Sequence, residues 1–333
     1  MDNNTITLSH GSGGKDSAEL MEKVFAKHFS NEILDKMEDG AVLEIGHSRL
    51  VTSTDSFVVT PVEFKGGDIG KLSVCGTVND LLMMGAIPKY LTCGFIIEEG
   101  LEIEKLERIV KSTAKTAKEA GVMIVAGDTK VIDKGGSESG LLINTTGIGA
   151  LPEDRNISAA NCIDGDAVIV TGNLGDHHAC ILSARMNIEN DIKSDCAILS
   201  PITNPLYEKG IDVHTMRDIT RGGLGTVLNE IADSSDVSIE ISEERIPVDM
   251  EVKGFCGIMG LDPLYMGNEG KMIVIVKGSD GDKALDIIRS TELGKDASII
   301  GYAKSGRGVF SKTKIGGTRK IDLLYGEGLP RIC

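Results

Sequence analysis

The chain has 333 residues and a formal net charge of −15 at pH 7, with its basic residues scattered rather than clustered. This charge argues against binding a nucleic-acid backbone or an anionic membrane surface. The length is typical of two domains, and the sequence has neither a membrane-spanning apolar run nor a signal peptide, so a cytoplasmic protein is expected. The seven cysteines include no Cys-x-x-Cys pair, which disfavours a disulfide framework and a structural zinc site.

The first predicted elements are a strand at residues 5–8, a glycine-rich loop and an amphipathic helix that follows it. The loop consists of Gly11, Ser12, Gly13, Gly14 and Lys15. It is not a Walker A sequence, because the first glycine and the final Ser or Thr of that motif are missing. A glycine-rich loop before a helix still offers free amides to an anion. The alternative is a mobile N-terminal loop without a ligand.

The remaining elements predict an α+β fold of two domains. Strands are expected at 41–46, 49–54, 89–97, 141–149, 167–170, 271–277, 298–303 and 317–324, and helices at 101–120, 178–187, 222–234 and 281–291. Because strict β-α-β alternation is missing, each domain should have a mixed or antiparallel sheet covered by helices. The predicted domains are residues 1–152 and 153–319, followed by a mobile tail, 320–333.

Three aspartates in the first half suggest a metal site. Asp80 lies in an apolar helical run, where a carboxylate needs a cation or several donors. Asp55 and Asp128 each follow a strand-like run. Carboxylates at strand ends facing one on a helix suit Mg²⁺, which takes oxygen ligands and usually accompanies nucleotide phosphates. The alternative for Asp80 alone is a cap on a neighbouring element.

Two segments of the second half carry charged residues beside glycines. Residues 216–225, Met-Arg-Asp-Ile-Thr-Arg-Gly-Gly-Leu-Gly, precede a helix. Their alternative interpretation is an N-cap by Asp218 or Thr220 with Arg217 in a surface ion pair. Glu269, in Met-Gly-Asn-Glu-Gly, is either functional or a turn residue.

Histidines 177 and 178 are adjacent, and adjacent residues of one helix cannot both face one ion. Metal ligation by this pair is therefore disfavoured.

The last residue, Cys333, is an unpaired cysteine. Its α-carboxylate disfavours a second negative charge, so the thiol is not a self-activated nucleophile. It could instead carry a group loaded by another enzyme, and the alternative is a cysteine without function. From residue 321 to residue 333 an extended chain spans roughly 40 Å at about 3.3 Å per residue, enough to reach a cleft between domains.

Taken together, five blocks resemble the HypE family of hydrogenase maturation factors, the carbamoyl dehydratases. They are Val-Cys-Gly-Thr-Val-Asn-Asp-Leu-Leu-Met-Met-Gly-Ala-Ile-Pro at 74–88, Val-Ala-Gly-Asp-Thr-Lys-Val at 125–131, residues 216–223, Gly-Asn-Glu-Gly at 267–270 and the terminal Pro-Arg-Ile-Cys. The first three blocks are shared more loosely with aminoimidazole ribonucleotide synthetase, thiamine monophosphate kinase and selenophosphate synthetase. His178 departs from the pattern, since glycine is expected there.

The resemblance implies a homodimer in which the N-terminal sheets form a barrel-like centre with ATP sites along it. It also implies a reaction. HypF, a carbamoyltransferase, would load Cys333; ATP would phosphorylate the carboxamide oxygen; and loss of phosphate would leave a thiocyanate. The cyano group would pass to iron held by a HypC–HypD complex, for nickel-iron hydrogenase.

The resemblance also assigns roles to residues. Mg²⁺ is assigned to Asp55, Asp80 and Asp128, and Cys333, Glu269 and Lys130 are the catalytic residues. Because Asp128 favours the protonated form of Lys130, Glu269 is the preferred base and Lys130 a stabiliser of negative charge. Nucleotide binding is assigned to Gly11, Ser12, Gly13, Gly14, Lys15, Asn79, Asp80, Asp218, Gly222 and Gly223.

Two other functions remain open from the sequence. One is a related enzyme that phosphorylates a small molecule. The other is a non-catalytic, nucleotide-gated scaffold for metal-centre assembly.

Overall fold

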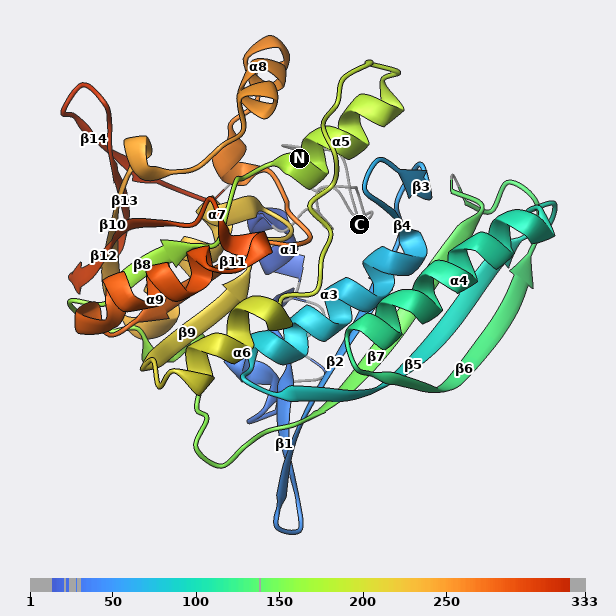
Figure 1. The fold of residues 1–333 in the computed structure, drawn as a ribbon, viewed down its shortest axis with the longest axis horizontal. Helices are drawn as coiled ribbons and strands as arrows, with labels where there is room; N and C mark the ends of the chain where they lie inside the picture. The colour runs from blue at the N-terminus through green and yellow to red at the C-terminus, as the bar shows by residue number, and fades with distance from the viewer. Residues whose placement is uncertain (1–13, 21, 24–27, 29–30, 138, 324–333) are drawn as a thin grey trace.

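The computed structural model describes residues 14–20, 22–23, 28, 31–137 and 139–323, which form two α+β domains (Figure 1). The expected strand at 5–8 lies outside these residues. Within the described chain, no helix is long and apolar enough to cross a membrane.

The first domain is built on a five-stranded sheet in the order β1-β2-β7-β5-β6. All neighbours are antiparallel except β5 and β6, which are parallel because helix α4 connects them. The elements are β1 (Ala41–Ile45), β2 (Ser48–Phe57), a small hairpin of β3 (Glu63–Phe64) and β4 (Gly67–Asp68), α3 (Ile69–Met83), β5 (Ile87–Glu98), α4 (Ile103–Glu119), β6 (Met123–Ile132) and β7 (Leu141–Ala150), preceded by α1 (Lys15–Leu20).

The second domain contains a seven-stranded sheet in the order β14-β13-β10-β12-β8-β11-β9. It is mixed, since β10 and β13 pair in parallel while the other neighbours are antiparallel. The elements are β8 (Ala167–Val170), α5 (Asp176–Arg185), α6 (Ser200–Glu208), β9 (Val213–Asp218), α7 (Gly223–Ser235), β10 (Val237–Ser242), α8 (Met250–Met259), β11 (Met272–Val276), α9 (Gly281–Arg289), β12 (Ser298–Ser305), β13 (Gly308–Lys312) and β14 (Thr318–Ile321).

Helix α3 lies at the centre of the molecule, between the first sheet and the second domain (Figure 1). Its N-terminus is capped by the Asp68 carboxylate, which accepts a hydrogen bond from the Lys71 amide. Val74 and Val78 pack into a core shared with α6, α9 and one face of the second sheet, whereas α7 packs on the opposite face of that sheet. Most residues of α3 are buried, and its two charged side chains, Lys71 near the start and Asp80 near the end, are only half-buried.

The mixed sheets agree with the sequence prediction, but three boundaries differ from it. β2 runs through Asp55 to Phe57, and β6 runs through Asp128 to Ile132, so both aspartates lie within strands rather than at their ends. β14 continues to Ile321 and pairs with β13. The expected tail therefore begins after this strand, and its first two residues belong to the second domain.

Candidate active site

A cavity of about 310 Å³ lies where the two domains meet. Its wall is formed by β2 and α3 of the first domain and by β9, α7 and the turn before β11 of the second domain. The wall is strongly charged, with six carboxylates and two guanidinium groups, namely Asp39, Asp55, Asp80, Asp218, Glu230, Glu269, Arg217 and Arg221. Such a concentration of negative charge at a domain boundary favours a bound cation.

Asp80 projects from α3 into this cavity. Its carboxylate accepts a hydrogen bond from the Ser53 hydroxyl at 2.5 Å. Burial raises the pKa of Asp80 well above its usual value, and the nearby carboxylates of Asp55 and Asp218 raise it further. Asp55, Asp80 and Asp218 therefore repel one another, and a bound cation would offset this repulsion.

Asp218 stands at the end of β9, on the second domain's side of the cavity. Burial raises the pKa of this carboxyl to about 6, the Arg217 guanidinium opposes the rise, and Asp55 adds to it. Among the described residues, no three His, Cys, Asp or Glu side chains are grouped closely enough to hold a metal alone. Mg²⁺ needs only one or two carboxylates when water and phosphates complete its coordination, so the donor set fits Mg²⁺ bound together with a nucleotide.

Arg217 forms a buried ion network that joins the two domains. Its guanidinium lies 2.8 Å from the Asp39 carboxylate and 3.0 Å from that of Glu230. The Arg217 side chain is 13% exposed, so the alternative of a surface ion pair is wrong. The cap alternative is also wrong, because α7 begins after Gly222 without any side-chain cap.

The glycine pair before α7 has a conformational reason. Both residues have positive φ, +76° at Gly222 and +62° at Gly223. A Cβ at Gly223 would also lie 2.5 Å from the backbone carbon of Tyr265. The two glycines therefore let the chain turn from β9 into α7 against the Tyr265 backbone, while the assigned contact with a nucleotide stays a prediction.

Asp128 does not join Asp55 and Asp80 within one chain, which corrects the three-aspartate site. Asp55 of β2 pairs with Thr145 of β7, whereas Asp128 of β6 pairs with Gly94 of β5. The strands that carry the two aspartates are three positions apart in the sheet, which is roughly 14 Å at about 4.8 Å per strand. Thr145 is buried beneath α3, and Gly94 pairs with the exposed Asn144, so the two aspartates occupy opposite faces of the sheet.

Lys130 lies on the same open face as Asp128. Its ammonium lies 2.5 Å from the Asp128 carboxylate, and both side chains are about two-thirds exposed. The hydrogen bond from Lys130 lowers the pKa of Asp128. One chain therefore presents this pair to solvent, away from its own cavity.

Asn79 has a structural role rather than the expected role in nucleotide binding. Its amide nitrogen donates to the carbonyl of Ala197 at 3.0 Å, and its amide oxygen accepts from the Leu199 backbone at 2.9 Å. The side chain is 2% exposed. Asn79 thus fastens α3 to the segment before α6, while its neighbour Asp80 faces the cavity.

Glu269 lies in the wall of the cavity, on the turn that enters β11, and is 4% exposed. Its backbone amide donates to the Asp195 carboxylate at 3.1 Å, and its carbonyl accepts from Ala197. Its backbone therefore forms the turn, as the turn-residue alternative states, and its side chain lies in the cavity wall, where a role in proton transfer stays a prediction.

The structure describes only part of the predicted glycine-rich loop and does not describe the terminal cysteine. Gly11, Ser12, Gly13 and Cys333 lie outside the described residues. Gly14 is buried, and Lys15 begins α1, with its ammonium 4.0 Å from Glu19.

The adjacent histidines are both buried, in α5. His177 shares a 2.7 Å hydrogen bond with Ser194 and meets the ring of Phe64 edge-on. His178 accepts a bond from the Gly267 amide at 3.3 Å, and burial lowers its pKa to about 3, so the ring is neutral. The departure at His178 is accommodated because its ring packs against the turn that carries Glu269.

Several cavity and support residues were not predicted as functional. Asp39, Ser53 and Glu230 line the cavity, and Asp195 holds the turn of Glu269. The only sequence signal was the acidic pair Glu38-Asp39 before a glycine and a strand. The sequence could not predict that the cavity residues lie close together, because they come from segments far apart in the chain.

Comparisons with known proteins agree with this architecture. Residues 37–151 match the N-terminal domain, and residues 164–314 the C-terminal domain, of AIR synthase related proteins. The carbamoyl dehydratase HypE of Escherichia coli K12 is 43% identical over 99% of this chain and 100% of its own length. A solved structure of the hydrogenase maturation protein HypE in complex with ATP has a TM-score of 0.83 at 44% identity, covering 99% of this chain and 100% of that one.

A second solved structure, a HypE–HypF complex, has a TM-score of 0.87 at 48% identity and covers 92% of this chain and 99% of the matched chain. Both domains, the whole length and the fold are thus shared with these proteins. The chain therefore belongs to the HypE family of carbamoyl dehydratases.

Proposed function

We propose that this protein is an ATP-dependent carbamoyl dehydratase that converts the S-carboxamide on its own Cys333 into a thiocyanate, for the maturation of nickel-iron hydrogenase. The observation that carries the proposal is the interdomain cavity, in which Asp80 and Glu269 are contributed by different domains. The full-length similarity to HypE of Escherichia coli and to the ATP complex of a HypE supports it.

The reaction proceeds in two balanced steps. The carboxamide oxygen attacks the γ-phosphorus of ATP, ADP leaves, and the nitrogen loses one proton to give a phosphorylated imidate. The carbon–oxygen bond then breaks, phosphate departs, and the nitrogen loses its second proton to leave the cyano group. Phosphorylation is needed because an amide oxygen is a very poor leaving group.

The cavity residues supply positioning and charge for these steps. We assign the Mg²⁺ that accompanies ATP to the space beside Asp55, Asp80 and Asp218, where one or two of these carboxylates would bind it together with water and phosphate oxygens and its charge would offset their mutual repulsion. Mg²⁺ neutralises charge on the phosphates of a phosphoryl-transfer reaction. Glu269 is assigned as the base at the carboxamide nitrogen, because it lies in the same cavity and is shielded from solvent.

The beginning of the tail is bound to Tyr265 and to helix α7, which forms part of the cavity wall. Tyr265 donates its hydroxyl hydrogen to the carbonyl of Asp322 at 2.8 Å, and Asn229 donates to the carbonyl of Ile321 at 3.1 Å. From residue 322, the 11 residues to Cys333 span roughly 36 Å when extended, at about 3.3 Å each. Asn229 directly precedes Glu230 of the cavity wall, so the tail starts one residue contact from the cavity and this length suffices for Cys333 to enter it.

Replacing the terminal thiol tests the proposal directly. We expect Cys333→Ala to abolish formation of the cyano group, because the carbamoyl carrier is gone. Mass spectrometry of the C-terminal peptide, after incubation with the transferase, carbamoyl phosphate and ATP, measures the product. Cys162→Ala is the matched control, since that thiol is buried in the second domain. A Cys333→Ala protein that still acquired the cyano group would rule the proposal out.

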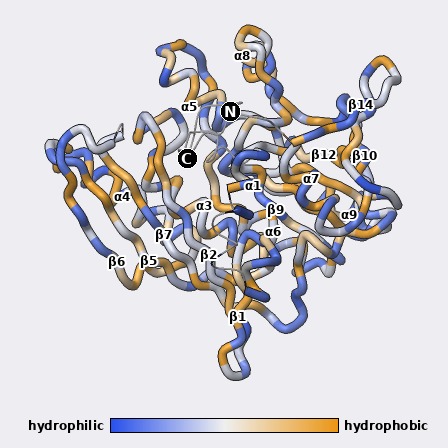
Figure 2. Tube along the Cα trace, turned by 180° about the vertical axis from the view of Figure 1, so that it is seen from behind, coloured by the Kyte–Doolittle hydropathy of each residue, from blue (hydrophilic) through white to orange (hydrophobic). Residues whose placement is uncertain are grey.

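We further propose a homodimer that pairs the open faces of the first-domain sheets. Figure 2 shows hydrophobic residues along β5 and β6. By strand register, the open face that carries Asp128 also carries apolar side chains that a single chain leaves exposed, including Tyr90 at 48%, Ile96 at 41% and Met123 at 64%. Pairing around a two-fold axis would cover them and carry Asp128 and Lys130 toward the partner's cavity.

Subunit mixing tests this dimer. If Asp128 serves the partner, mixing inactive Asp80→Asn and Asp128→Asn chains should restore part of the activity, because some dimers then contain one cavity with both aspartates intact. Mixing each variant with itself is the control. The proposed dimer would be contradicted if analytical ultracentrifugation gave the mass of a monomer, or if the mixture were as inactive as each variant alone.

HypF is the proposed carbamoyl donor, because a solved HypE forms a complex with HypF. The proposed acceptor of the cyano group is iron on a HypC–HypD complex, and the proposed location of the protein is the cytoplasm. These assignments rest on membership of the family.

A further inference from the structure

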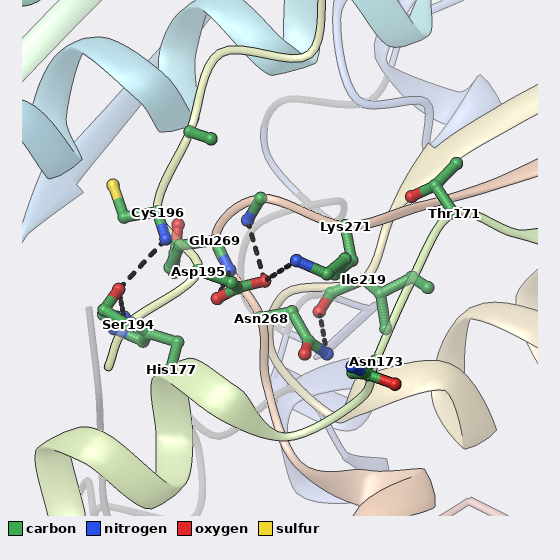
Figure 3. Close-up of polar contacts among 12 residues, drawn as sticks. Thr171, Asn173, His177, Ser194, Asp195, Cys196, Ile219, Asn268, Glu269 and Lys271 are labelled. Atoms are coloured by element: carbon green, nitrogen blue, oxygen red, sulfur yellow. Dashed lines mark hydrogen bonds and ion pairs between the residues drawn. The ribbon is translucent and has the colours of Figure 1, made fainter. Parts of the chain in front are cut away.

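The turn that carries Glu269 is fixed by a buried carboxylate outside the cavity, that of Asp195 (Figure 3). One oxygen of Asp195 accepts a hydrogen bond from the Glu269 amide at 3.1 Å, and the other accepts from the Gly270 amide at 3.2 Å. The Lys271 ammonium lies 3.3 Å from the second oxygen. Three successive residues of the turn are thus bound to one carboxylate.

The contacts between Asp195 and the turn are buried, so water cannot replace a lost hydrogen bond easily. The Asp195 side chain is 2% exposed and that of Lys271 is 10% exposed. A buried carboxylate requires a counter-charge and hydrogen-bond donors, and here Lys271 and the two amides supply them. There is no free space at Gly270, since a Cβ there would lie 1.9 Å from the Asp195 carbonyl oxygen. The turn and the Asp195 segment are therefore in direct backbone contact.

The segment that carries Asp195 also connects Glu269 with α3. The Ala197 amide donates to the Glu269 carbonyl at 3.2 Å. Two residues of the same segment, Ala197 and Leu199, are bound by the side chain of Asn79. Asn79 immediately precedes Asp80 in the helix. A continuous series of hydrogen bonds thus runs from the neighbour of Asp80, through residues 195–199, to the backbone of Glu269.

We propose that Asp195 is a positioning residue for the dehydration, and that residues 195–199 set the place of Glu269 relative to Asp80 across the domain boundary. The inference rests on the proposed function, in which Glu269 is the base. Asp195 lies behind the turn and contacts its backbone, so it acts on the reaction only through Glu269. A base must lie within hydrogen-bond reach of the proton that it removes, and small displacements reduce the rate strongly.

The test replaces the carboxylate by its neutral isostere. In Asp195→Asn only one of the two acceptor oxygens remains. The NH₂ group that replaces the other oxygen is a donor and faces a backbone amide or the Lys271 ammonium, which are also donors. We expect amide hydrogen exchange in a peptide covering residues 266–271 to become at least about tenfold faster. We also expect kcat to fall at least about tenfold, with the KM for ATP within about twofold of the wild-type value.

A double-mutant cycle separates positioning from a general loss of structure. If Asp195 acts through Glu269, adding Asp195→Asn to Glu269→Gln should cause little further loss in a single-turnover assay, because the group being positioned is already gone. Asp191→Asn is the matched control, since it makes the same charge change at an exposed position four residues before Asp195. Should Asp195→Asn fail to fold, Asp195→Glu keeps the charge but displaces the carboxylate, and the same faster exchange and lower kcat are expected.

Unchanged amide exchange in the 266–271 peptide together with an unchanged kcat would overturn the inference, as would fully multiplicative losses in the double mutant. A failure of the proposed function would be seen in a different measurement, the activity of the Glu269→Gln variant. A Glu269→Gln enzyme with full activity would show that Glu269 is not the base, whereas the exchange measurement reports on the Asp195 contacts whatever the chemistry.

Discussion

Replacing Asp80 by asparagine should lower ATP turnover at least about a hundredfold, the effect of removing one charge-stabilising group from a transition state. The carboxylate lies among Asp55 and Asp218 in the interdomain cavity, where a neutral amide cannot contribute the same charge to a cation. ADP release with carbamoylated protein at saturating Mg²⁺ measures the effect. An unchanged rate would remove Asp80 from the metal site.

The same variant should not lose stability. Burial and neighbouring carboxylates raise the pKa of Asp80 in the folded protein, so ionisation of this group opposes folding above its unfolded pKa of about 4. The cost grows as the pH rises from there through the folded pKa, and asparagine removes it. Thermal unfolding at pH 8 without Mg²⁺ should therefore give a Tm equal to or above that of the wild type. Asp282→Asn, an exposed position on α9, is the control for the charge change.

Replacing Glu269 by glutamine should reduce thiocyanate formation by about 10²–10⁴, the usual contribution of a general base. Glutamine keeps the size of the side chain but cannot accept the proton. The main-chain bonds of the turn to Asp195 remain, so the fold and ATP binding should be retained. Rapid quenching followed by mass spectrometry of the C-terminal peptide gives the rate.

The control for this change is Glu292→Gln, because the Glu292 side chain is 84% exposed and forms a surface ion pair with Lys295. If the Glu269 variant formed thiocyanate at the wild-type rate, another group would have to be the base.

Most elements of the fold could be predicted from local patterns. The apolar, β-branched runs gave β1, β5, β7, β8 and β11 with small boundary errors, and the amphipathic pattern gave α4. Helix α6 was missed because it contains prolines at its start and at Pro205. β9 was missed because its sequence, Val-His-Thr-Met-Arg-Asp, is not strand-like in itself, and long-range pairing with β11 determines its conformation.

The candidate site was only partly predictable, and helix geometry explains one error. Asn79 and Asp80 were both expected near the nucleotide. Adjacent residues of a helix point about 100° apart, so only one of them can face the cavity. Asp80 faces it, while Asn79 binds Ala197 and Leu199.

Sheet register explains the other error. Asp55 and Asp128 follow similar sequence patterns, but strand order and register place them on opposite faces, three strands apart. Neither property can be deduced from spacing along the chain. The pairing of Arg217 with Asp39 was equally inaccessible, because it joins two segments almost 180 residues apart.

Tracing the carboxamide oxygen shows whether ATP phosphorylates the S-carboxamide of Cys333. The protein is loaded from carbamoyl phosphate labelled with oxygen-18 in its carbonyl group and then given unlabelled ATP. If the carboxamide oxygen of Cys333 is phosphorylated, the released inorganic phosphate must contain the label, and the C-terminal peptide must lose the mass of one water. Unlabelled phosphate accompanying a dehydrated peptide would show that the oxygen leaves by another route and would contradict the proposed mechanism.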